Sequence, residues 1–483
     1  MKLLLFSLSL FLVYTSCSQT PDAIKRQQQV VNNLSPEVIY GDSMPHLTIE
    51  GQMKLYGVRG VSIAVIKDYK IDWAKGYGWA DEEEKRPVTN DTRFQAASIS
   101  KSLNSVGIMK LVQQGKIDLD ADINTYLKTW RFPYDSVSKN KMITVRNLLT
   151  HTAGLTVHGF RGYETTDVLP TLTQVLNGEK PANSPAVRSQ FEPSLRFQYS
   201  GGGTTISQLI LTDITGERYE NYMKKNVLDP LGMTNSSYAQ PSQIDPKYLA
   251  SAYYGGGGKV KGKYHVYPEQ AAAGLWTTPT DLAKYIIETQ LAYEGKSSKV
   301  LSQAMTQQRL TFYIDSAAAL GSFLMRKEGQ IYFTHNGGNE GFACTSFGSL
   351  QGGNGVVVMT NADNFAIIPE IVNSVAKVYG WKAFYTPTFR KVLTITADTL
   401  QAYAGSYLAG KDTISFSVRD NALYAQQNSQ PPAGYKLLFN TSTTAWIKEA
   451  PGVKIGFVFD ADGKVNTMTI DEGGQKVNCP RIK

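Results

Sequence analysis

The hydrophobic pattern of the chain changes within residues 381–395, and this change limits the architectures available to it. Before that segment, apolar runs with helical spacing alternate with apolar runs typical of strands. After it, apolar and polar residues alternate, and the turn sequences Asp420–Asn421 and Asp462–Gly463 separate such runs as in β-hairpins. The length of 483 residues also exceeds the usual size of one hydrophobic core. We therefore expect a larger domain over residues 46–380, a linker over 381–395 and a small all-β domain over 396–483.

The larger domain is expected to be of the α+β class. Strand-like runs lie near both of its ends, over residues 61–78 and 355–363, and helical patterns lie between them, as in 98–115, 201–216 and 278–293. This order favours a central antiparallel sheet with a helix on one side and a helical subdomain.

The first 17 residues have the composition of an export signal. Lys2 precedes an apolar stretch that is too short to span a bilayer as a permanent helix, and small residues follow it. Thr15–Cys17 is similar to a lipobox, with Tyr14 where an aliphatic residue is usual, so Cys17 is the candidate lipidated residue. Residues 18–45 are polar and would form a tether. We expect an exported protein of the periplasm or cell envelope, anchored to the membrane through Cys17; the alternative is ordinary cleavage and a soluble product.

Charge and cysteine content exclude several other classes of partner. The net charge of +8 comes from scattered residues without a long Lys/Arg run, so we expect no nucleic-acid partner. Cys344 and Cys479, the two cysteines beyond the signal, give neither a disulfide framework nor a metal spacing. The five histidines form no H-E-x-x-H motif or close cluster. We expect no metal and no other cofactor.

Three S-x-x-K sequences are present, and their contexts differ. Ser136 lies in a polar loop sequence and Ser374 lies inside a helical pattern. Only Ser98 opens a mostly apolar helix, which places Lys101 on the same face, one turn further on. A lysine at the start of a buried helix is costly unless its charge is needed. Nucleophilic catalysis by Ser98 is one such need, whereas a plain helix cap is the simpler alternative.

Two further segments supply partners for that chemistry. Tyr199 precedes a glycine-rich turn, and its phenol near Lys101 would act as a base toward Ser98. The sequence T-H-N-G-G at 334–338 follows a strand pattern and lets an edge strand approach a substrate closely. The backbone N–H groups of Gly338 and Ser98 would then form an oxyanion hole. For His151, in the turn at 148–155, we favour a structural role.

Taken in order, these segments resemble the serine hydrolases related to class C β-lactamases and penicillin-binding D,D-peptidases. The resemblance rests on S-I-S-K (98–101), Y-S-G (199–201) and H-N-G (335–337), supported by L-L-T-H-T-A-G-L, D-P-L-G-M-T-N-S-S and A-A-G-L-W-T-T-P-T-D-L-A-K-Y. It implies that Ser98 is the nucleophile, that Lys101 and Tyr199 activate it, and that His335, Asn336 and Gly337 line the substrate beside Gly338. The tail resembles the lipocalin-like β domain often appended to such hydrolases.

Two positions depart from the motifs of that family. Gly201 stands where Y-x-N has asparagine, and His335 replaces the lysine of K-T-G with a side chain that is largely neutral at pH 7. We therefore expect a hydrolase that cleaves an amide or ester in a small molecule or peptide through an acyl-enzyme at Ser98. A true β-lactamase or D-alanyl-D-alanine carboxypeptidase is one alternative, and a non-catalytic binding protein on the same fold is another. No serine has the G-x-S-x-G frame of an α/β-hydrolase.

Overall fold

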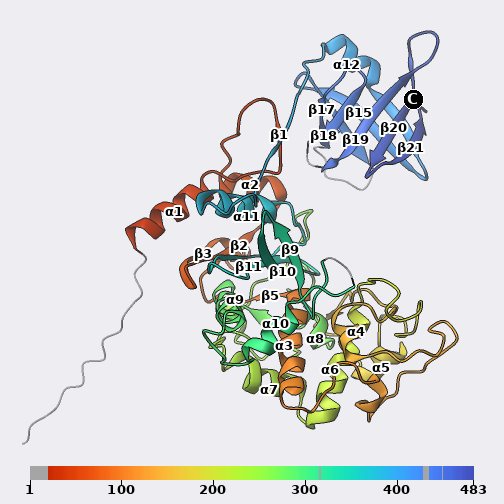
Figure 1. The fold of residues 1–483 in the computed structure, drawn as a ribbon. Coiled ribbons are helices and arrows are strands. Elements are labelled where there is room, and N and C mark those ends of the chain that lie inside the picture. The colour runs from red at the N-terminus through yellow and green to blue at the C-terminus, as the bar shows by residue number, and fades with distance from the viewer. Residues whose placement is uncertain (1–19, 315–316, 428–433, 449, 483) are drawn as a thin grey trace, which may run out of the picture.

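The computed structural model describes residues 20–314, 317–427, 434–448 and 450–482, which form a larger and a smaller domain (Figure 1). The larger domain is built on a seven-stranded antiparallel sheet with the strand order β4-β3-β2-β12-β11-β10-β9. Its strands are β2 Gly60–Lys67, β3 Lys70–Asp81, β4 Arg86–Pro87, β9 Phe323–Lys327, β10 Gln330–Asn339, β11 Phe342–Ser349 and β12 Gly355–Thr360.

Helices cover both faces of this sheet, which explains why its central strands read as continuous apolar runs. Successive side chains of β2 enter different hydrophobic clusters: Ala64 and Ile66 face one, whereas Ile63 and Val65 face the other. Helix α9 (Pro279–Tyr293) packs against the first face, and α11 (Ile367–Val378) covers the second. Because successive side chains of a strand point to opposite faces, the apolar side chains of β2 contribute to the hydrophobic cores on both faces of the sheet.

A group of helices and loops beside the first face, together with α2 (Ile49–Tyr56) beside α11 on the second face, completes the larger domain. Helix α3 (Ser100–Gln113) is buried along most of its length and lies in the middle of this group (Figure 1). Three two-stranded ribbons and three short 3-10 turns connect the helices. The remaining elements are α2 Ile49–Tyr56, α4 Val145–Leu149, α5 Leu172–Asn177, α6 Gly201–Thr215, α7 Tyr219–Met223 with a π turn over Lys224–Leu228, α8 Gln270–Ala273 and α10 Gln303–Arg309; the ribbons β1 Val38–Tyr40 with β13 Thr388–Arg390, β5 Phe94–Gln95 with β8 Trp276–Thr277, and β6 Tyr163–Glu164 with β7 His265–Val266; and the 3-10 turns Ala97–Ile99, Ile123–Thr125 and Pro246–Tyr248.

The segment expected as a polar tether over 18–45 is folded onto the larger domain where the structure describes it. Residues 21–31 form helix α1 (Pro21–Val31), which Thr20 caps by accepting a hydrogen bond from the Ala23 amide. The helix buries Val30 against α11, and Arg26 makes two hydrogen bonds of 2.9 and 2.7 Å to Asp72. The tether prediction relied on the polar composition of the segment and missed that its few apolar residues form one narrow face of an amphipathic helix.

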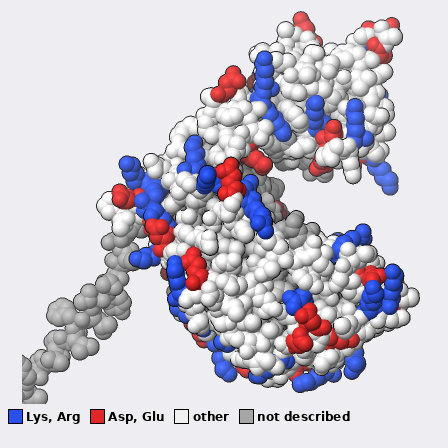
Figure 2. Space-filling view, viewed as in Figure 1, with Lys and Arg blue, Asp and Glu red and all other residues white. Residues whose placement is uncertain are grey.

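The expected linker over 381–395 likewise belongs in part to the larger domain. Trp381 and Phe384 are buried in the cluster on the α11 face. Further on, β13 pairs in parallel with β1, and the Arg390 guanidinium lies 3.8 Å from the ring centroid of Trp446 in the smaller domain. The connection is therefore paired with the N-terminal segment and contacts both domains. Figure 2 shows an open notch between the two domains.

The smaller domain is an eight-stranded antiparallel sheet in which neighbours in sequence are neighbours in space. Its ends approach each other, because Tyr407 forms a bridge with Arg481 and the Ile482 amide donates to the Ser406 carbonyl at 2.8 Å. Aromatic rings fill its interior; the ring of Tyr403 stacks on Phe457 at 4.4 Å. The elements are α12 Ala397–Tyr403, β14 Gly405–Ala409, β15 Asp412–Arg419, β16 Ala422–Gln427, β17 Tyr435–Phe439, β18 Thr444–Ile447, β19 Ala450–Phe459, β20 Val465–Glu472 and β21 Gln475–Pro480.

The predicted fold class, an α+β domain with a central antiparallel sheet and a small all-β domain, is therefore confirmed. Cys344 and Cys479 lie in different domains and are both free. Among the described residues, no helix has the length and apolar character needed to cross a membrane, and no three His, Cys, Asp or Glu side chains are arranged to hold a metal ion. Basic and acidic side chains are interspersed on the face shown in Figure 2. Cys17 lies outside the described residues.

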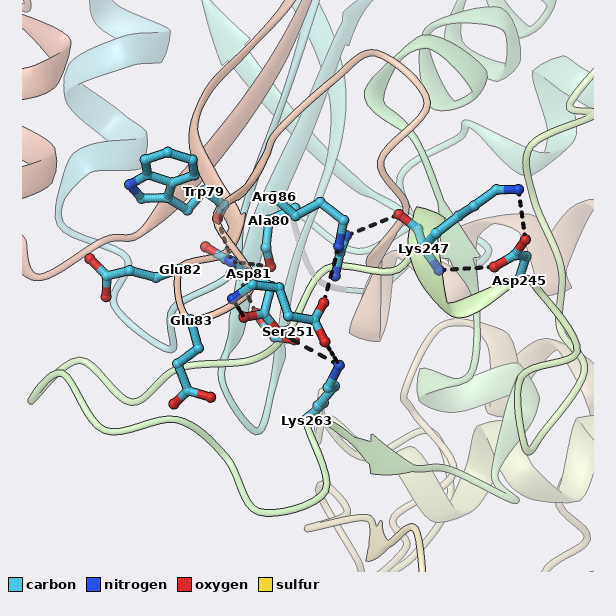
Figure 3. A network of polar contacts seen from close by, with 12 residues as sticks. Trp79, Ala80, Asp81, Glu82, Glu83, Arg86, Asp245, Lys247, Ser251 and Lys263 are labelled. Atoms are coloured by element: carbon cyan, nitrogen blue, oxygen red, sulfur yellow. Dashed lines mark hydrogen bonds and ion pairs between the residues drawn. The ribbon is translucent and has the colours of Figure 1, made fainter.

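A buried carboxylate fastens the end of β3 to the loop that follows residue 250 (Figure 3). Asp81 has no exposed surface; its Oδ2 accepts a hydrogen bond of 2.6 Å from Ser251 and forms an ion pair of 2.9 Å with Lys259. Burial alone would raise the pKa of Asp81, but the hydrogen bonds from Ser251, Lys259 and the Glu84 amide together lower it to about 2.

Replacing Asp81 with asparagine is expected to lower the free energy of unfolding by about 2–4 kcal/mol, because Lys259 loses its buried counter-ion. Since the folded-state pKa lies below the ordinary value of 3.8, the wild-type contribution is complete above about pH 5 and is lost as the pH falls through the folded-state pKa of about 2. Urea unfolding of both proteins between pH 2 and 7 measures this. In the control Glu83→Gln, only the exposed partner of Lys259 changes, and the loss should stay below about 1 kcal/mol; equal losses would contradict the assignment.

Candidate active site

Ser98 and Lys101 lie together at the start of the central helix. Ser98 occupies the 3-10 turn Ala97–Ile99, which continues directly into α3, so the two side chains share one face. The Lys101 ammonium donates to Ser98 Oγ at 2.9 Å and to the Ala272 carbonyl at 2.7 Å. Ala97, immediately before the serine, has φ = 47°, a left-handed conformation that costs free energy for a residue with a Cβ. The turn is held by its surroundings in a strained geometry that presents Ser98.

Lys101 is a buried cation whose surroundings contain no matching anion. It is 4% exposed, and the described residues place no carboxylate in ion-pair contact with it. A cation in this position stabilises negative charge that develops nearby and disfavours positive charge. Burial, followed by the charge of Lys101, lowers the pKa of His335 to about 3 and lowers that of His151 well below its ordinary value. Both imidazoles are therefore neutral at pH 7.

Tyr199 approaches the same pair from the start of α6. Its half-buried ring lies 4.4 Å from that of His151 and has its centroid 5.1 Å from Lys101 Nζ. The turn is fixed on both sides, because the Ser200 amide donates to His151 Nδ1 at 3.2 Å and the Ser200 hydroxyl caps α6. These contacts give His151 a positioning role beside Tyr199, in line with the structural role expected from the sequence.

The second half of β10 forms the opposite wall. Strand β9 pairs only as far as Thr334, so residues 335–339 have β11 on one side and no strand on the other within the described chain. Along this edge, His335 is buried, and its Nδ1 lies 2.6 Å from the Asn336 carbonyl oxygen. Its Nε2 is buried without a hydrogen-bond partner. An unpaired strand edge next to Ser98 offers backbone groups to an extended substrate.

Gly337 permits the close approach of this edge to the Ser98 turn. A Cβ at Gly337 would lie 2.3 Å from the Ala96 carbonyl oxygen and 3.1 Å from the Ala97 Cβ. It would also lie 2.6 Å from Cys344 Sγ, which itself contacts the Ala96 carbonyl at 3.2 Å. Only a residue without a side chain fits between the strand and the turn.

Replacing Gly337 with alanine is therefore expected to separate β10 from the Ser98 turn. We expect a loss of about 1–3 kcal/mol in the free energy of unfolding, and a fall of about 100-fold in the hydrolysis that the sequence predicts, because displacements near 1 Å have such effects. Gly338→Ala is the matched comparison: its Cβ would meet only the ring of Phe365, which is 42% exposed and free to move. Equal losses in both variants, measured by calorimetry and ester hydrolysis, would contradict this account.

These residues enclose a cavity of about 300 Å³ whose lining is uncharged. Gly201 occupies the position of the asparagine in Y-x-N motifs. A Cβ on Gly201 would lie 3.0 Å from the ring of Phe160, so this ring occupies the space that a side chain at position 201 would need. Ser98 and Tyr199 both line the cavity, and Lys101 contacts Ser98 Oγ at 2.9 Å. The cavity is lined by Ser98, Tyr199, Phe323, Met325, Thr334, His335, Asn336, Gly337, Gly338, Phe347 and Phe365.

Comparison with known families agrees with this geometry. The family model described as Beta-lactamase matches residues 47–367. The chain belongs to the beta-lactamase family. Protein flp of Staphylococcus aureus (strain N315) is 24% identical over 334 residues, covering 67% of this chain and 64% of flp. The putative penicillin-binding protein PbpX of Bacillus subtilis (strain 168) is 25% identical over 331 residues, covering 68% of this chain and 76% of that protein. The chain thus spans slightly less than two thirds of the length of flp.

Solved structures share the beta-lactamase fold with this chain. The octameric penicillin-binding protein homologue from Pyrococcus abyssi has a TM-score of 0.60 at 20% identity, covering 89% of this chain and 98% of its own. The D-amino acid amidase from Ochrobactrum anthropi SV3, complexed with L-phenylalanine, has a TM-score of 0.57 at 21% identity, covering 74% and 98%. The fold is that of this serine hydrolase family, as the sequence resemblance implied.

The places of several groups in the site of this beta-lactamase-family domain could not be predicted from the sequence. Ala272 begins the A-A-G-L-W segment that supported the resemblance, but that segment did not indicate that the Ala272 carbonyl would accept a hydrogen bond from Lys101. The cavity walls Phe323, Met325 and Phe365 come from an edge strand and from the loop before α11. Alternation along β9 would have placed Phe323 and Met325 on one face, but only the fold shows that this face meets Tyr199.

Proposed function

We propose that the protein is a serine hydrolase that cleaves an amide or ester through an acyl-enzyme at Ser98. The observation that carries the proposal is the 2.9 Å contact between Lys101 Nζ and Ser98 Oγ at a cavity that Tyr199 also lines. A nucleophile, a buried cation and a phenol in one small cavity are the components of an activated serine.

In the proposed reaction, the Tyr199 phenolate, stabilised by the Lys101 ammonium, takes the proton from Ser98. Ser98 Oγ then attacks the carbonyl carbon, and the N–H groups of Ser98 and Gly338 stabilise the tetrahedral oxyanion. Tyr199 returns the proton to the departing amine or alcohol, which leaves the acyl-enzyme. Water, deprotonated in the same way, attacks the acyl carbon and releases Ser98. The balance requires only the substrate and one water molecule.

The uncharged lining favours a substrate that is neutral near the scissile bond. His335, which is neutral at pH 7, stands where a lysine would attract a substrate carboxylate. This disfavours the alternatives of a true β-lactamase and a D-alanyl-D-alanine carboxypeptidase, whose substrates carry that carboxylate. The similar fold of a D-amino acid amidase is compatible with a neutral amide.

The first experiment incubates the full-length protein with a fluorophosphonate and, separately, with penicillin, and follows the masses of protein and drug together. We expect fluorophosphonate to add to Ser98 and penicillin to be left unchanged. A matched Ser98→Ala sample shows whether the label is specific. Absence of any fluorophosphonate adduct would overturn the proposal and favour the non-catalytic binding protein.

The penicillin sample separates the two remaining enzymatic alternatives. A lasting penicillin adduct on Ser98 would indicate a penicillin-binding peptidase, and drug loss without an adduct would indicate a β-lactamase. Either result would retain the nucleophile and overturn the preference for neutral substrates.

We further propose that the protein is exported and anchored through a lipid on Cys17. The support is the sequence of residues 1–17, and helix α1 begins only four residues after that cysteine. Several acyl chains on one cysteine anchor a protein firmly. A Cys17→Ser variant is therefore expected to move from the detergent phase to the aqueous phase on phase separation. The same distribution for both proteins would contradict the anchor.

A further inference from the structure

A second hollow, of about 460 Å³, opens from the reaction cavity on the α11 side of the sheet. The two spaces share four lining residues, Met325, Asn336, Phe347 and Phe365, so they lie next to each other along the same sheet edge. Several separate parts of the chain line the second hollow: strands β9, β10 and β11, one side of α11 with Phe365 before it, Glu37, and residues 383–386 of the connection to the β domain. We call it the α11 compartment.

Most of the α11 compartment is apolar. Its apolar walls include Phe347 from β11, Ile368 and Val372 from α11, and Phe384 from the connection, whereas Thr345 and Asn373 are uncharged polar residues of the lining. The charged side chains that line it are Glu37 and Lys327. A space of this kind favours an aromatic or branched aliphatic group over a charged one, because burying apolar surface is favourable and burying an unpaired charge is costly.

Two residues at the junction can orient a ligand that enters both spaces. Asn336 Oδ1 accepts a hydrogen bond of 2.6 Å from Thr345 Oγ1, so the Nδ2 amide group remains as the hydrogen-bond donor of this side chain. Phe365 is 42% exposed, and its ring lies beside Gly338, where a Cβ would be 3.1 Å from Cζ. An amide donor and an exposed aromatic ring therefore stand between Ser98 and the α11 compartment.

We propose that the α11 compartment binds an apolar, uncharged arm of the substrate, at least as large as a phenyl group, while the scissile carbonyl lies at Ser98. This inference rests on the proposed function of Ser98 and specifies the substrate class. Most of the walls that define the compartment lie outside the family match at 47–367: Glu37, Ile368, Val372 and residues 383–386. The preference therefore depends on α11 and on the connection between the two domains, beyond the segment that the family model matches.

The test fills the compartment at its far side. Thr386 is exposed and lines the compartment, so Thr386→Trp places an indole there without touching Ser98. Thr388→Trp is the matched control, because Thr388 is also exposed, lies two residues further along and does not line the compartment. Methylboronic acid and 4-phenylbutylboronic acid, which add to a serine nucleophile, compete with fluorophosphonate labelling of Ser98 in the full-length wild type and both variants.

In wild type and in Thr388→Trp, the phenylbutyl compound should protect Ser98 at a concentration at least tenfold lower than methylboronic acid. In Thr386→Trp that ratio should fall below about threefold, with protection by methylboronic acid unchanged. A ratio that is the same in all three proteins would contradict substrate binding in the α11 compartment but would leave the assignment of Ser98 as the nucleophile unaffected.

A second measurement does not need the nucleophile. Calorimetric titration of Ser98→Ala with 4-phenylbutanamide should show binding that acetamide lacks, and adding Thr386→Trp should abolish it. If no fluorophosphonate reacts with Ser98, the proposed hydrolase function fails, and this titration still decides the compartment: equal binding with and without Thr386→Trp would overturn it.

Discussion

Replacing Ser98 with alanine is expected to lower kcat/KM for amide or ester cleavage by a factor of about 10⁴ or more, because the change removes the hydroxyl that Lys101 contacts and that accepts the acyl group in the proposed reaction. The change removes one oxygen that accepts a hydrogen bond from Lys101, and Ser98 is only half-buried. The free energy of unfolding should therefore change by less than about 1 kcal/mol. Steady-state hydrolysis and thermal unfolding of the same preparation measure both quantities.

The other S-x-x-K sequences supply the control for this prediction. Ser136 is exposed in a loop, so Ser136→Ala should retain full activity. The Ser374 hydroxyl donates to Asn33 and Glu370 carbonyls inside the α11 cluster, so its removal should affect stability and leave chemistry intact. Unchanged turnover in Ser98→Ala would show that the reaction uses another nucleophile.

Replacing Lys101 with methionine is expected to lower kcat/KM by a factor of about 10² to 10⁴ without a comparable loss of stability. The reaction loses the cation that stabilises the phenolate, whereas the folded protein no longer buries a charge without a carboxylate partner. Loss of the hydrogen bond to the Ala272 carbonyl acts in the opposite direction. The free energy of unfolding should therefore change by less than about 2 kcal/mol.

Histidine titration gives a readout that a purely structural role of Lys101 would not move. Burial first, and then the positive charge of Lys101, lowers the pKa of both His151 and His335. Both pKa values should therefore rise in Lys101→Met, and NMR of the ring protons measures them. Lys110→Met is the control in the same helix, because Lys110 donates to the Val300 carbonyl away from the cavity. Activity loss without any histidine shift would contradict the electrostatic role.

The local parts of the site were accessible from the sequence. The i, i+3 spacing of Ser98 and Lys101 and the apolar residues after them predicted a buried helix, and the structure places the two side chains 2.9 Å apart. Hairpin turns at Asp420–Asn421 and Asp462–Gly463 predicted the all-β domain in the same way. Such features depend on neighbours within a few residues, so a pattern in the chain is sufficient to predict them.

The prediction of a polar tether shows where such patterns fail. Helix α1 presents only a narrow apolar face, and its stability depends on α11, which lies more than 300 residues away in the chain. A short helix is marginal in isolation and becomes stable only through tertiary packing. Composition alone therefore could not distinguish a docked helix from a flexible segment.

The sequence by itself determined the fold class with its two domains and the placement of Ser98 and Lys101 on one face of a buried helix, because these features are encoded by residue patterns within continuous segments. Only the tertiary structure decided the surroundings of that pair. It brought an unpaired edge of β10, Gly337 and Tyr199 against Ser98, left the cavity uncharged, and joined it to the α11 compartment. The physical reason is that these features arise between segments distant in the chain, where packing and burial decide which side chains meet.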